Sequence, residues 1–194
     1  MEKVENPPYY GRGVTVWFTG LPSSGKTTIA HKLEGILRDR GCKVEVFDGD
    51  VIRKHLCSDL GFSKQDRDTN IKRIAYVCKL MTRNGVVAIA AAISPYREIR
   101  DYARKEIGDF LEVYVKCPID VCTKRDVKGL YKKALNGEIK GFTGVDDPYE
   151  EPLHPEVILE THNESVEDST NKVVQLLEDR GYLQPARKGH RSSL

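Results

Sequence analysis

Residues 19–28 read TGLPSSGKTT, and this stretch decides the fold of the chain. It places Gly20, Gly25, Lys26 and Thr27 at the spacing G-x-x-x-x-G-K-[ST] of a phosphate-binding loop. The apolar run VTVWF precedes it as a predicted strand, and TTIAHKLEGILRDRG follows it as a predicted helix. The alternative, a plain glycine-rich turn, does not require a strand, a loop and a helix in this order. The order therefore favours a site for a nucleoside triphosphate.

The residue types of this loop suit polyphosphate binding. Glycines let the backbone approach phosphate oxygens closely, so amide N–H groups point inward, and the helix N-terminus adds about half a unit of positive charge. Lys26 is expected to neutralise the β- and γ-phosphates, and the Thr27 hydroxyl is expected to bind Mg²⁺.

Strand and helix patterns alternate along the rest of the chain. Short apolar runs predict five strands, at residues 14–18, 44–47, 86–92, 111–115 and, more weakly, 157–159. Apolar residues at three-and-four spacing predict helices over 71–81 and 166–177. Because near-continuous apolar strands are typical of parallel sheets, we expect an α/β fold of the P-loop NTPase type. It would have a five-stranded parallel sheet, helices on both faces, and ligands at the carboxyl ends of the strands.

Composition excludes several classes of protein. A chain of 194 residues with 39% hydrophobic residues suits one folded domain. The 31 basic residues nearly balance the 29 acidic ones, which argues against a nucleic-acid binder held by bulk charge. The N-terminal residues are too polar for a signal peptide, and no apolar run is long enough to cross a bilayer. We therefore expect a cytoplasmic protein with no nucleic-acid or membrane partner.

The cysteines point to the same compartment. The chain has five, at Cys42, Cys57, Cys78, Cys117 and Cys122. An odd number without paired C-x-x-C spacing indicates reduced thiols. Cys117 and Cys122 resemble half of a metal site, but no His or Cys pair at a suitable spacing completes it, so core or surface thiols are the better interpretation.

The two ends and one internal segment differ from the regular pattern. Residues 1–12 and the basic residues 184–194 are predicted tails around a domain at 13–183. Residues 128–155 are rich in Gly, Pro, Lys and acidic residues, which is typical of a functional lid or a disordered segment. A hinged lid over about 127–152 would close over phosphates and exclude water, although a solvated flexible loop has the same composition.

A GTP-dependent switch is the first alternative to an enzyme. DVKG at 126–129 matches the D-x-x-G of such proteins, but it lies far downstream in a Lys-rich segment, and no N-K-x-D motif is present. The third predicted strand also lacks the terminal Asp with which large ATPases hold Mg²⁺. A chance match is the better interpretation of DVKG.

Carboxylates instead follow the second predicted strand, in VFDGDVIR. Asp48 and Asp50 at a strand end could orient Mg²⁺ and accept a proton from an attacking hydroxyl. A turn with a helix cap uses the same residue types. Beside a phosphate loop, the acid pair favours a small-molecule kinase.

The segment GFSKQDRDTNIKR, residues 61–73, is the next candidate. Ser63 is a predicted N-cap, and Arg67 and Asn70 follow on one helical face, where they could bind an anionic, hydroxyl-bearing substrate. Their spacing alone favours a solvated polar face, and Phe62 before the cap can be a hydrophobic staple.

Together these motifs resemble those of adenylyl-sulfate kinase, also called APS kinase. The resemblance rests on GLPSSGKTT, DGDVIR, GFSKQDRDTNIKR, ISPY and RDVKGLYKKALNGEIKGFTGVDDPYE, and it runs from about residue 13 to about residue 181. The lid sequence KGLYKKA…IKGFTG is more specific to that family than the phosphate loop is. The resemblance implies transfer of the γ-phosphate of ATP to the 3′-hydroxyl of adenosine 5′-phosphosulfate (APS), which gives PAPS and ADP in sulfate activation.

The resemblance also implies roles for individual residues. Lys26, Asp48 and Asp50 would be catalytic, with Asp48 as general base, and Thr27 with Asp48 would hold Mg²⁺. ATP would contact Gly20, Leu21, Pro22, Ser23, Ser24, Gly25, Lys26, Thr27, Thr28 and Arg125. APS would contact Asp50, Arg53, Phe62, Arg67, Asn70, Ile93, Ser94, Lys128, Gly141 and Phe142. The two phenylalanines would sandwich the adenine of APS.

The resemblance assigns Ser94 the place of a serine proposed to carry a phosphoryl group in bacterial relatives. A nucleophilic serine needs a neighbouring base, and AISPY offers none. Direct in-line transfer needs only positioning and charge neutralisation, so we expect that catalysis does not require Ser94 as an intermediate.

The family resemblance further implies a homodimer, acting alone or fused to ATP sulfurylase. The chain is long enough for the kinase alone, so we expect a stand-alone enzyme or an excised domain. Two alternatives stay open: another small P-loop kinase, acting on a sugar acid or a nucleoside monophosphate, and a regulatory subunit that binds ATP without turnover. The presence of Lys26, Asp48 and Asp50 argues against the regulatory subunit.

Overall fold

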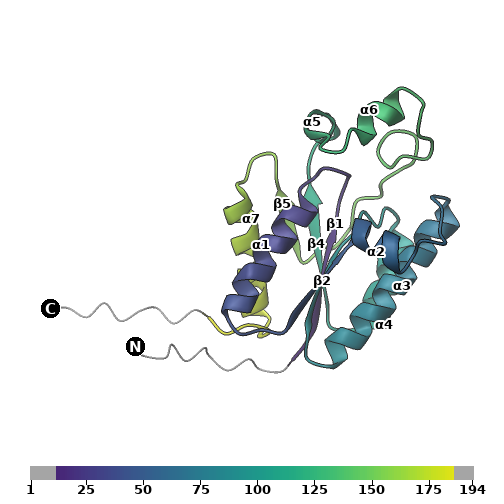
Figure 1. Ribbon diagram of the computed structural model, residues 1–194. Coiled ribbons are helices and arrows are strands. Elements are labelled where there is room, and N and C mark those ends of the chain that lie inside the picture. The colour runs from purple at the N-terminus through teal and green to yellow at the C-terminus, as the bar shows by residue number, and fades with distance from the viewer. Residues whose placement is uncertain (1–11, 186–194) are drawn as a thin grey trace.

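A computed structural model describes residues 12–185, in which five strands form one parallel sheet (Figure 1). In spatial order, the strands are β2 (Val44–Asp48), β3 (Val87–Ala91), β1 (Val14–Thr19), β4 (Phe110–Lys116) and β5 (Val157–Glu160). All five predicted strands are confirmed to within one residue at each end. The parallel order means that every strand ends at the same edge of the sheet.

Helices cover both faces, as predicted. The four long helices are α1 (Lys26–Asp39) and α7 (Val166–Asp179) on one face, with α3 (Lys64–Arg83) and α4 (Arg97–Ile107) on the other (Figure 1). The three short helices are α2 (Gly49–His55), α5 (Ile119–Arg125) and α6 (Leu130–Leu135). The predicted helices over 71–81 and 166–177 are confirmed, although Val166 is exposed because it only begins α7.

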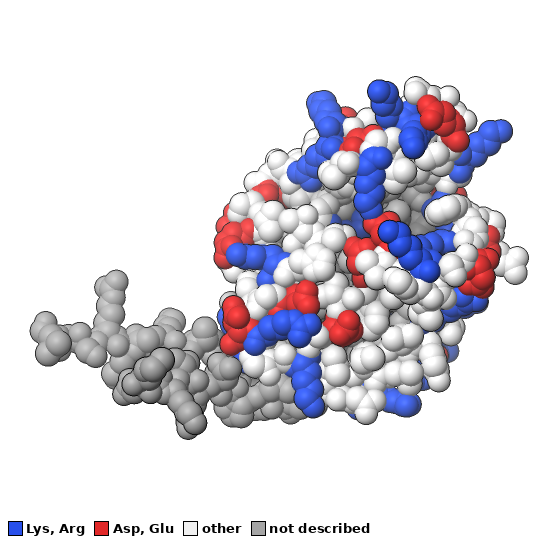
Figure 2. Space-filling model, in the orientation of Figure 1, with Lys and Arg blue, Asp and Glu red and all other residues white. Residues whose placement is uncertain are grey.

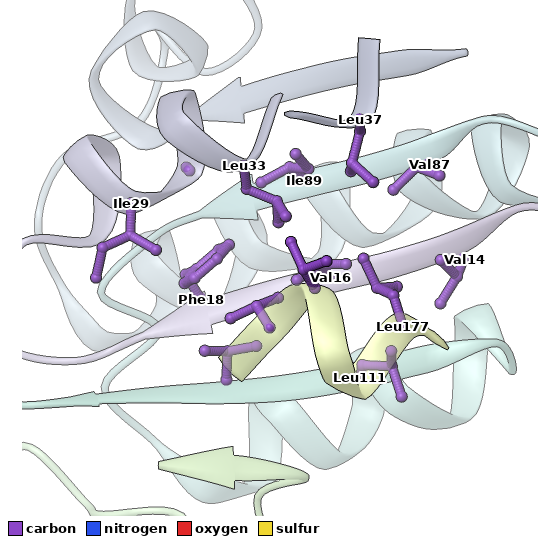
Figure 3. Close-up of a cluster of buried hydrophobic side chains, with 14 of the residues drawn as sticks. Val14, Val16, Phe18, Ile29, Leu33, Leu37, Val87, Ile89, Leu111 and Leu177 are labelled. Carbon is purple, nitrogen blue, oxygen red and sulfur yellow. The ribbon is translucent and has the colours of Figure 1, made fainter. Parts of the chain in front are cut away.

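The central strand β1 separates two hydrophobic cores by the alternation of its side chains. Val14, Val16 and Phe18 pack against α1 and α7, whereas Trp17 packs against α3 and α4. Figure 3 shows the first core, in which Leu33 of α1 approaches β1. Each such buried side chain contributes about 1.5–3 kcal/mol, so the sheet forms a rigid platform for the loops at its edge.

Those loops contain the sequence motifs. The phosphate loop follows β1, the acid pair follows β2, Ser94 follows β3, and the predicted lid follows β4 and α5. The lid is not structureless, because it contains α6. Asp126, from the D-x-x-G match, accepts hydrogen bonds from the Tyr131 and Lys132 amides at 3.0 Å each. Asp126 is therefore explained by this contact with the start of α6, and its match to D-x-x-G does not require a GTP-dependent switch.

The remaining expectations concern the ends and the cysteines. Most of both predicted tails lies outside the described residues; Arg12 is described, and it donates to the Asp109 carboxylate at 2.7 Å. All five cysteines are free and buried. Between residues 12 and 185, no helix is both long and apolar enough to cross a membrane.

Candidate active site

The phosphate loop joins β1 to α1 in a strained backbone path. Gly20 has φ +148°, and a Cβ atom there would lie 2.4 Å from the carbonyl oxygen of Val115 on β4. Glycine is therefore required where the chain leaves the sheet. Gly25 precedes α1 at φ +106°, and no side chain caps this helix. The N-terminus of α1 is thus available to an anion, as phosphate binding requires.

Lys26 lies buried at the base of this loop. Its ammonium donates to the carbonyl oxygens of Gly20 at 2.9 Å and Leu21 at 2.7 Å. Burial lowers the pKa of Lys26 to about 8, even though Cys122 and the acids Asp50 and Asp48 act in the opposite direction. The ammonium is therefore poised for an anionic ligand that would restore its ordinary pKa.

Asp48 divides its two carboxylate oxygens between two tasks. Oδ2 accepts from the Thr27 hydroxyl at 2.7 Å, and Oδ1 caps α2 by accepting from the amides of Asp50 at 2.9 Å and Val51 at 3.3 Å. Partial burial raises the pKa of Asp48, but the hydrogen bonds from Thr27 and the two amides outweigh it, and the net pKa is below its ordinary value. Both sequence interpretations of Asp48 are thus compatible, because one oxygen caps the helix and the other faces the phosphate loop.

The Thr27–Asp48 pair fits Mg²⁺. This ion takes oxygen ligands and is usually held by one or two carboxylates together with substrate phosphates and water. Within the described part of the chain, no three His, Cys, Asp or Glu side chains gather at a metal-binding spacing. A site of one carboxylate and one hydroxyl, completed by a nucleotide, does not need such a cluster.

A cavity of about 1270 Å³ brings the phosphate loop and the predicted acceptor residues together. This volume exceeds the roughly 300–1,000 Å³ of a typical single-ligand site, which leaves room for two nucleotides. From the loop, the lining includes Pro22, Ser23, Gly25, Lys26, Thr27 and Thr28. The other predicted residues that line it are Asp48, Asp50, Arg53, Phe62, Arg67, Asn70, Ile93, Ser94, Arg125, Lys128 and Phe142.

Four predicted contact residues lie outside this lining: Gly20, Leu21, Ser24 and Gly141. Gly20 and Ser24 are buried behind the loop. Leu21 packs against a small core that contains Tyr131 of α6. Gly20, Leu21 and Ser24 thus shape the site from behind, whereas Gly141 lies in the lid, where its carbonyl oxygen accepts from Arg67.

Arg67 and Asn70 are buried on α3, so their interpretation as a solvated polar face is wrong. Tertiary packing covers this face, which helical spacing alone does not show. The side-chain oxygen of Asn70 has no hydrogen-bond partner among the described residues. Because buried amide oxygens are nearly always paired, an unpaired one in a cavity wall indicates a ligand contact.

Arg67 connects α3 to the lid. Its guanidinium donates to the carbonyl oxygen of Gly141 and to the hydroxyl of Thr143, and Nε donates to the carbonyl oxygen of Phe62 at 2.9 Å. Asp147 of the lid lies 3.6 Å from the same guanidinium. In this structure Arg67 therefore holds the lid against the acceptor wall.

The two predicted stacking residues occupy different settings. Phe62 is 69% exposed, with the Arg53 guanidinium 4.7 Å above its ring, so it is not a hydrophobic staple. Phe142 packs edge-on against Tyr131, with ring centroids 5.0 Å apart. The neighbouring N-cap prediction is confirmed, since the Ser63 hydroxyl accepts from the Asp66 amide.

Two basic residues of the α5–α6 lobe, Arg125 and Lys128, line the cavity. Figure 2 shows Lys and Arg side chains gathered over this lobe. The Lys128 ammonium forms an ion pair with Asp50. Arg125 donates to the carbonyl oxygen of Thr161 at 2.6 Å, and the Thr161 hydroxyl donates to the carbonyl oxygen of Ser24 at 2.7 Å. Arg125 is thereby anchored beside the phosphate loop.

Ser94 is buried and engaged in structural contacts. Its hydroxyl accepts from the indole Nε1 of Trp17 at 3.0 Å and lies 3.4 Å from the carbonyl oxygen of Ala92. No carboxylate or imidazole forms a hydrogen bond with this hydroxyl in the described part of the chain. This environment supports the expectation that Ser94 is not a nucleophile.

Several residues that hold the site together were not predicted as site residues. The Tyr131 hydroxyl of α6 donates to the carbonyl oxygen of Pro22 at 3.1 Å, and the Tyr149 hydroxyl lies 2.9 Å from that of Thr19. Tyrosines in an otherwise polar lid are a weak signal for such anchors. Their partners are distant in sequence, so spacing does not reveal them.

Comparisons with known proteins agree with this geometry. The sequence profile of adenylylsulphate kinase matches residues 12–160. An adenylyl-sulfate kinase from Rippkaea orientalis is 59% identical over 172 residues, which cover 89% of this chain and 95% of that protein. A probable bifunctional SAT/APS kinase 2 from Sorangium cellulosum is 56% identical over 171 residues, or 88% of this chain and 29% of that protein.

Among solved structures, Mycobacterium tuberculosis APS kinase in complex with AMPPNP and APS is similar, with a TM-score of 0.84 and 43% identity. The match covers 89% of this chain and 99% of that one. A gluconokinase from Sinorhizobium meliloti, 13% identical with a TM-score of 0.57 over 86% of this chain and 93% of that one, shares the fold alone. On its sequence and its structure, the chain belongs to the adenylyl-sulfate kinase family.

Proposed function

We propose that the chain transfers the γ-phosphate of ATP to the 3′-hydroxyl of APS, giving PAPS and ADP. The observation that carries the proposal is one cavity with two kinds of wall. One wall is the phosphate loop, and the other presents the unpaired amide oxygen of Asn70 and two phenylalanines. The similarity to a relative that was solved with AMPPNP and APS supports both ligands.

On the donor side, the loop amides and Lys26 bind the polyphosphate. Thr27 and Asp48 would hold Mg²⁺, which neutralises charge on the phosphate oxygens when it is bound. Phosphoryl transfer of this kind depends on positioning and charge stabilisation, which a rigid loop and a buried ammonium provide.

On the acceptor side, Asp48 takes the proton of the attacking hydroxyl. A bond forms between the 3′-oxygen and the γ-phosphorus, while the bond from that phosphorus to the β–γ bridging oxygen breaks and ADP leaves. The low pKa of Asp48 keeps it ionised at neutral pH, as the catalytic Asp of protein kinases must be. Arg53, Arg67 and Asn70 bind the phosphosulfate and ribose, and Phe62 and Phe142 stack on the adenine.

A coupled ADP-release assay tests this proposal. We expect turnover with APS at micromolar concentration, and little with gluconate or AMP offered at the same concentration. Turnover with one of those acceptors but not with APS would favour another small P-loop kinase. ATP binding without ADP release from any acceptor would favour a regulatory subunit.

We also propose that the chain assembles as a homodimer and that residues 127–152 open and close. Tyr76 of α3 and Tyr102 of α4, which lie on adjoining helices, are 57% and 41% exposed and could form an interface. A relative from Thiobacillus denitrificans is described as hexameric, but this chain covers 32% of that longer one. Light scattering on the purified protein separates a dimer from a monomer and from a hexamer.

A further inference from the structure

One buried side chain links the acceptor wall to the returning end of the lid. Arg100 of α4 is 2% exposed. Its Nε donates to Glu112 of β4 at 2.8 Å, one terminal nitrogen to the Ser94 carbonyl oxygen at 2.6 Å, and the other to that of Glu150 at 2.6 Å. The β3–α4 connection, β4 and the end of the lid therefore share one guanidinium.

The contact with Ser94 holds an uncommon backbone conformation. Ser94 has φ +40°, a value that non-glycine residues adopt only where their surroundings enforce it. Arg100 holds its carbonyl oxygen, and Trp17 holds its hydroxyl. Because Ile93 and Ser94 line the cavity, the position of this carbonyl determines the shape of the acceptor wall.

The contact with Glu150 anchors the lid where it returns to the domain. The Glu150 amide donates to the carbonyl oxygen of Pro95 at 2.8 Å, and its carboxylate accepts from the Arg97 amide at 2.7 Å. Arg100 adds the bond to the carbonyl oxygen. The end of the lid is thus tied to the same connection that forms the acceptor wall.

We infer that Arg100 is a positioning residue for the acceptor site, which sets the Ser94 wall and the lid anchor together without lining the cavity. The inference takes APS as the acceptor from the proposed function. Arginine suits this role because its planar fork offers several donors in fixed directions, whereas lysine offers a single ammonium. Glu112 neutralises the buried charge.

The test compares Arg100→Lys with Arg104→Lys. Arg104 belongs to the same charge network through Glu112 and Glu156, but no hydrogen bond joins it to Ser94 or Glu150. For Arg100→Lys we expect the KM of APS to rise about tenfold or more, since charged hydrogen bonds are lost, with the KM of ATP within about twofold. For Arg104→Lys we expect a lower Tm and no change in the ratio of the two KM values.

Tryptophan fluorescence supplies a readout that needs no substrate. Trp17 is the single tryptophan of the chain, and its indole donates to Ser94. We expect its emission to shift in Arg100→Lys and not in Arg104→Lys. If the wild-type protein failed to turn over APS, the proposed function would fail, while the emission would still test whether Arg100 positions Ser94.

A third variant covers the case in which Arg100→Lys does not fold. Arg97 is exposed and donates from Nε to the carbonyl oxygen of Glu151 at 2.7 Å, so Arg97→Ala loosens the same anchor from the surface. We expect a smaller rise in the KM of APS, of about threefold. Equal shifts of both KM values in Arg100→Lys and Arg104→Lys, unchanged Trp17 emission in Arg100→Lys, or an unchanged KM of APS in Arg97→Ala would overturn the inference.

Discussion

The donor and acceptor sides of the cavity are built in different ways. The donor side is a contiguous loop, residues 20–28, whose shape follows from backbone conformations next to a buried strand. The acceptor side comes from α2, α3, the β3–α4 connection and the lid, and side chains hold it together. Arg67 and Thr143, for example, meet across 76 positions of sequence. Phosphate recognition is thus encoded locally, whereas recognition of the acceptor depends on the assembled fold.

The largest effect is expected from removing the donor ammonium. Lys26→Ala should lower kcat by about a thousandfold or more, because charge stabilisation of the transferring phosphoryl group is lost. The fold should survive, since burial of this charge opposes folding, as its lowered pKa shows. ADP release and circular dichroism check both statements.

Lys32→Ala is the matched control on the same helix. Lys32 pairs with Glu167 at 3.0 Å on the surface and does not line the cavity. Its kcat should stay within about twofold of wild type. A Lys26→Ala variant that turned over as fast as Lys32→Ala would remove the phosphate loop from the mechanism.

Substitution of one glycine in the phosphate loop and of one in the lid compares how much each region contributes to the free energy of unfolding. Gly20→Ala should lower the free energy of unfolding by about 3 kcal/mol or more, because its Cβ would collide with the Val115 carbonyl oxygen. Gly141→Ala in the lid, at φ +67° with open space around it, should cost about 1–2 kcal/mol. Urea unfolding measures both changes. Equal losses would mean that the loop is no more constrained than the lid.

Phe142→Ala is expected to weaken binding of the acceptor and to leave binding of ATP unchanged. Base stacking is worth about 1–3 kcal/mol, so the KM of APS should rise roughly fivefold to a hundredfold, while the KM of ATP stays nearly constant. Leu135→Ala in α6, a residue 63% exposed, is the control within the lid and should change neither value. A rise in the KM of ATP instead would show that Phe142 serves the other nucleotide.

Deprotonation of Lys26 is expected to change activity and stability in opposite directions as the pH rises. Since its pKa is about 8, kcat/KM for ATP should fall about tenfold per pH unit above that value, as the free enzyme loses the ammonium. The folded pKa lies below the ordinary 10.5, so the unfolded chain binds more protons between these values. The contribution of this group to stability therefore rises over the same interval.

Steady-state initial rates and urea unfolding across this pH range test whether kcat/KM for ATP falls while the free energy of unfolding rises. Lys26→Ala should lack the corresponding rise in stability. A kcat/KM profile that stays flat well above pH 8 would contradict the assignment.

The smallest effect is expected at the ion pair between α2 and the lid, within the acceptor side. Lys128 and Asp50 have side chains that are 57% and 65% exposed, so Lys128→Gln should change the free energy of unfolding by less than about 1 kcal/mol. The KM of APS should rise by a few-fold at low salt and less at high salt, because screening weakens exposed charges. A salt-independent rise would point to a direct hydrogen bond with the acceptor.

Sequence reasoning succeeded where interactions are local. The strands, the phosphate loop and the Ser63 cap depend on neighbouring residues and are observed as predicted. It was wrong for the burial of Arg67 and Asn70 and for Phe62 as a staple, because the packing of α3 under the lid decides both. Helix α6 was missed since its sequence, rich in Lys and followed by Gly137, is typical of a loop.

The sequence by itself determined the sheet and the phosphate loop, because apolar periodicity and a short glycine motif act over a few residues at a time. It also determined the family, because the lid sequence KGLYKKA…IKGFTG adds a more specific motif to that loop. The tertiary structure alone decided which face of α3 is covered, which oxygen of Asp48 faces Thr27, and that Arg100 joins the acceptor wall to the lid. These features depend on side chains that meet only after strands far apart in the chain have paired, so no local pattern specifies them.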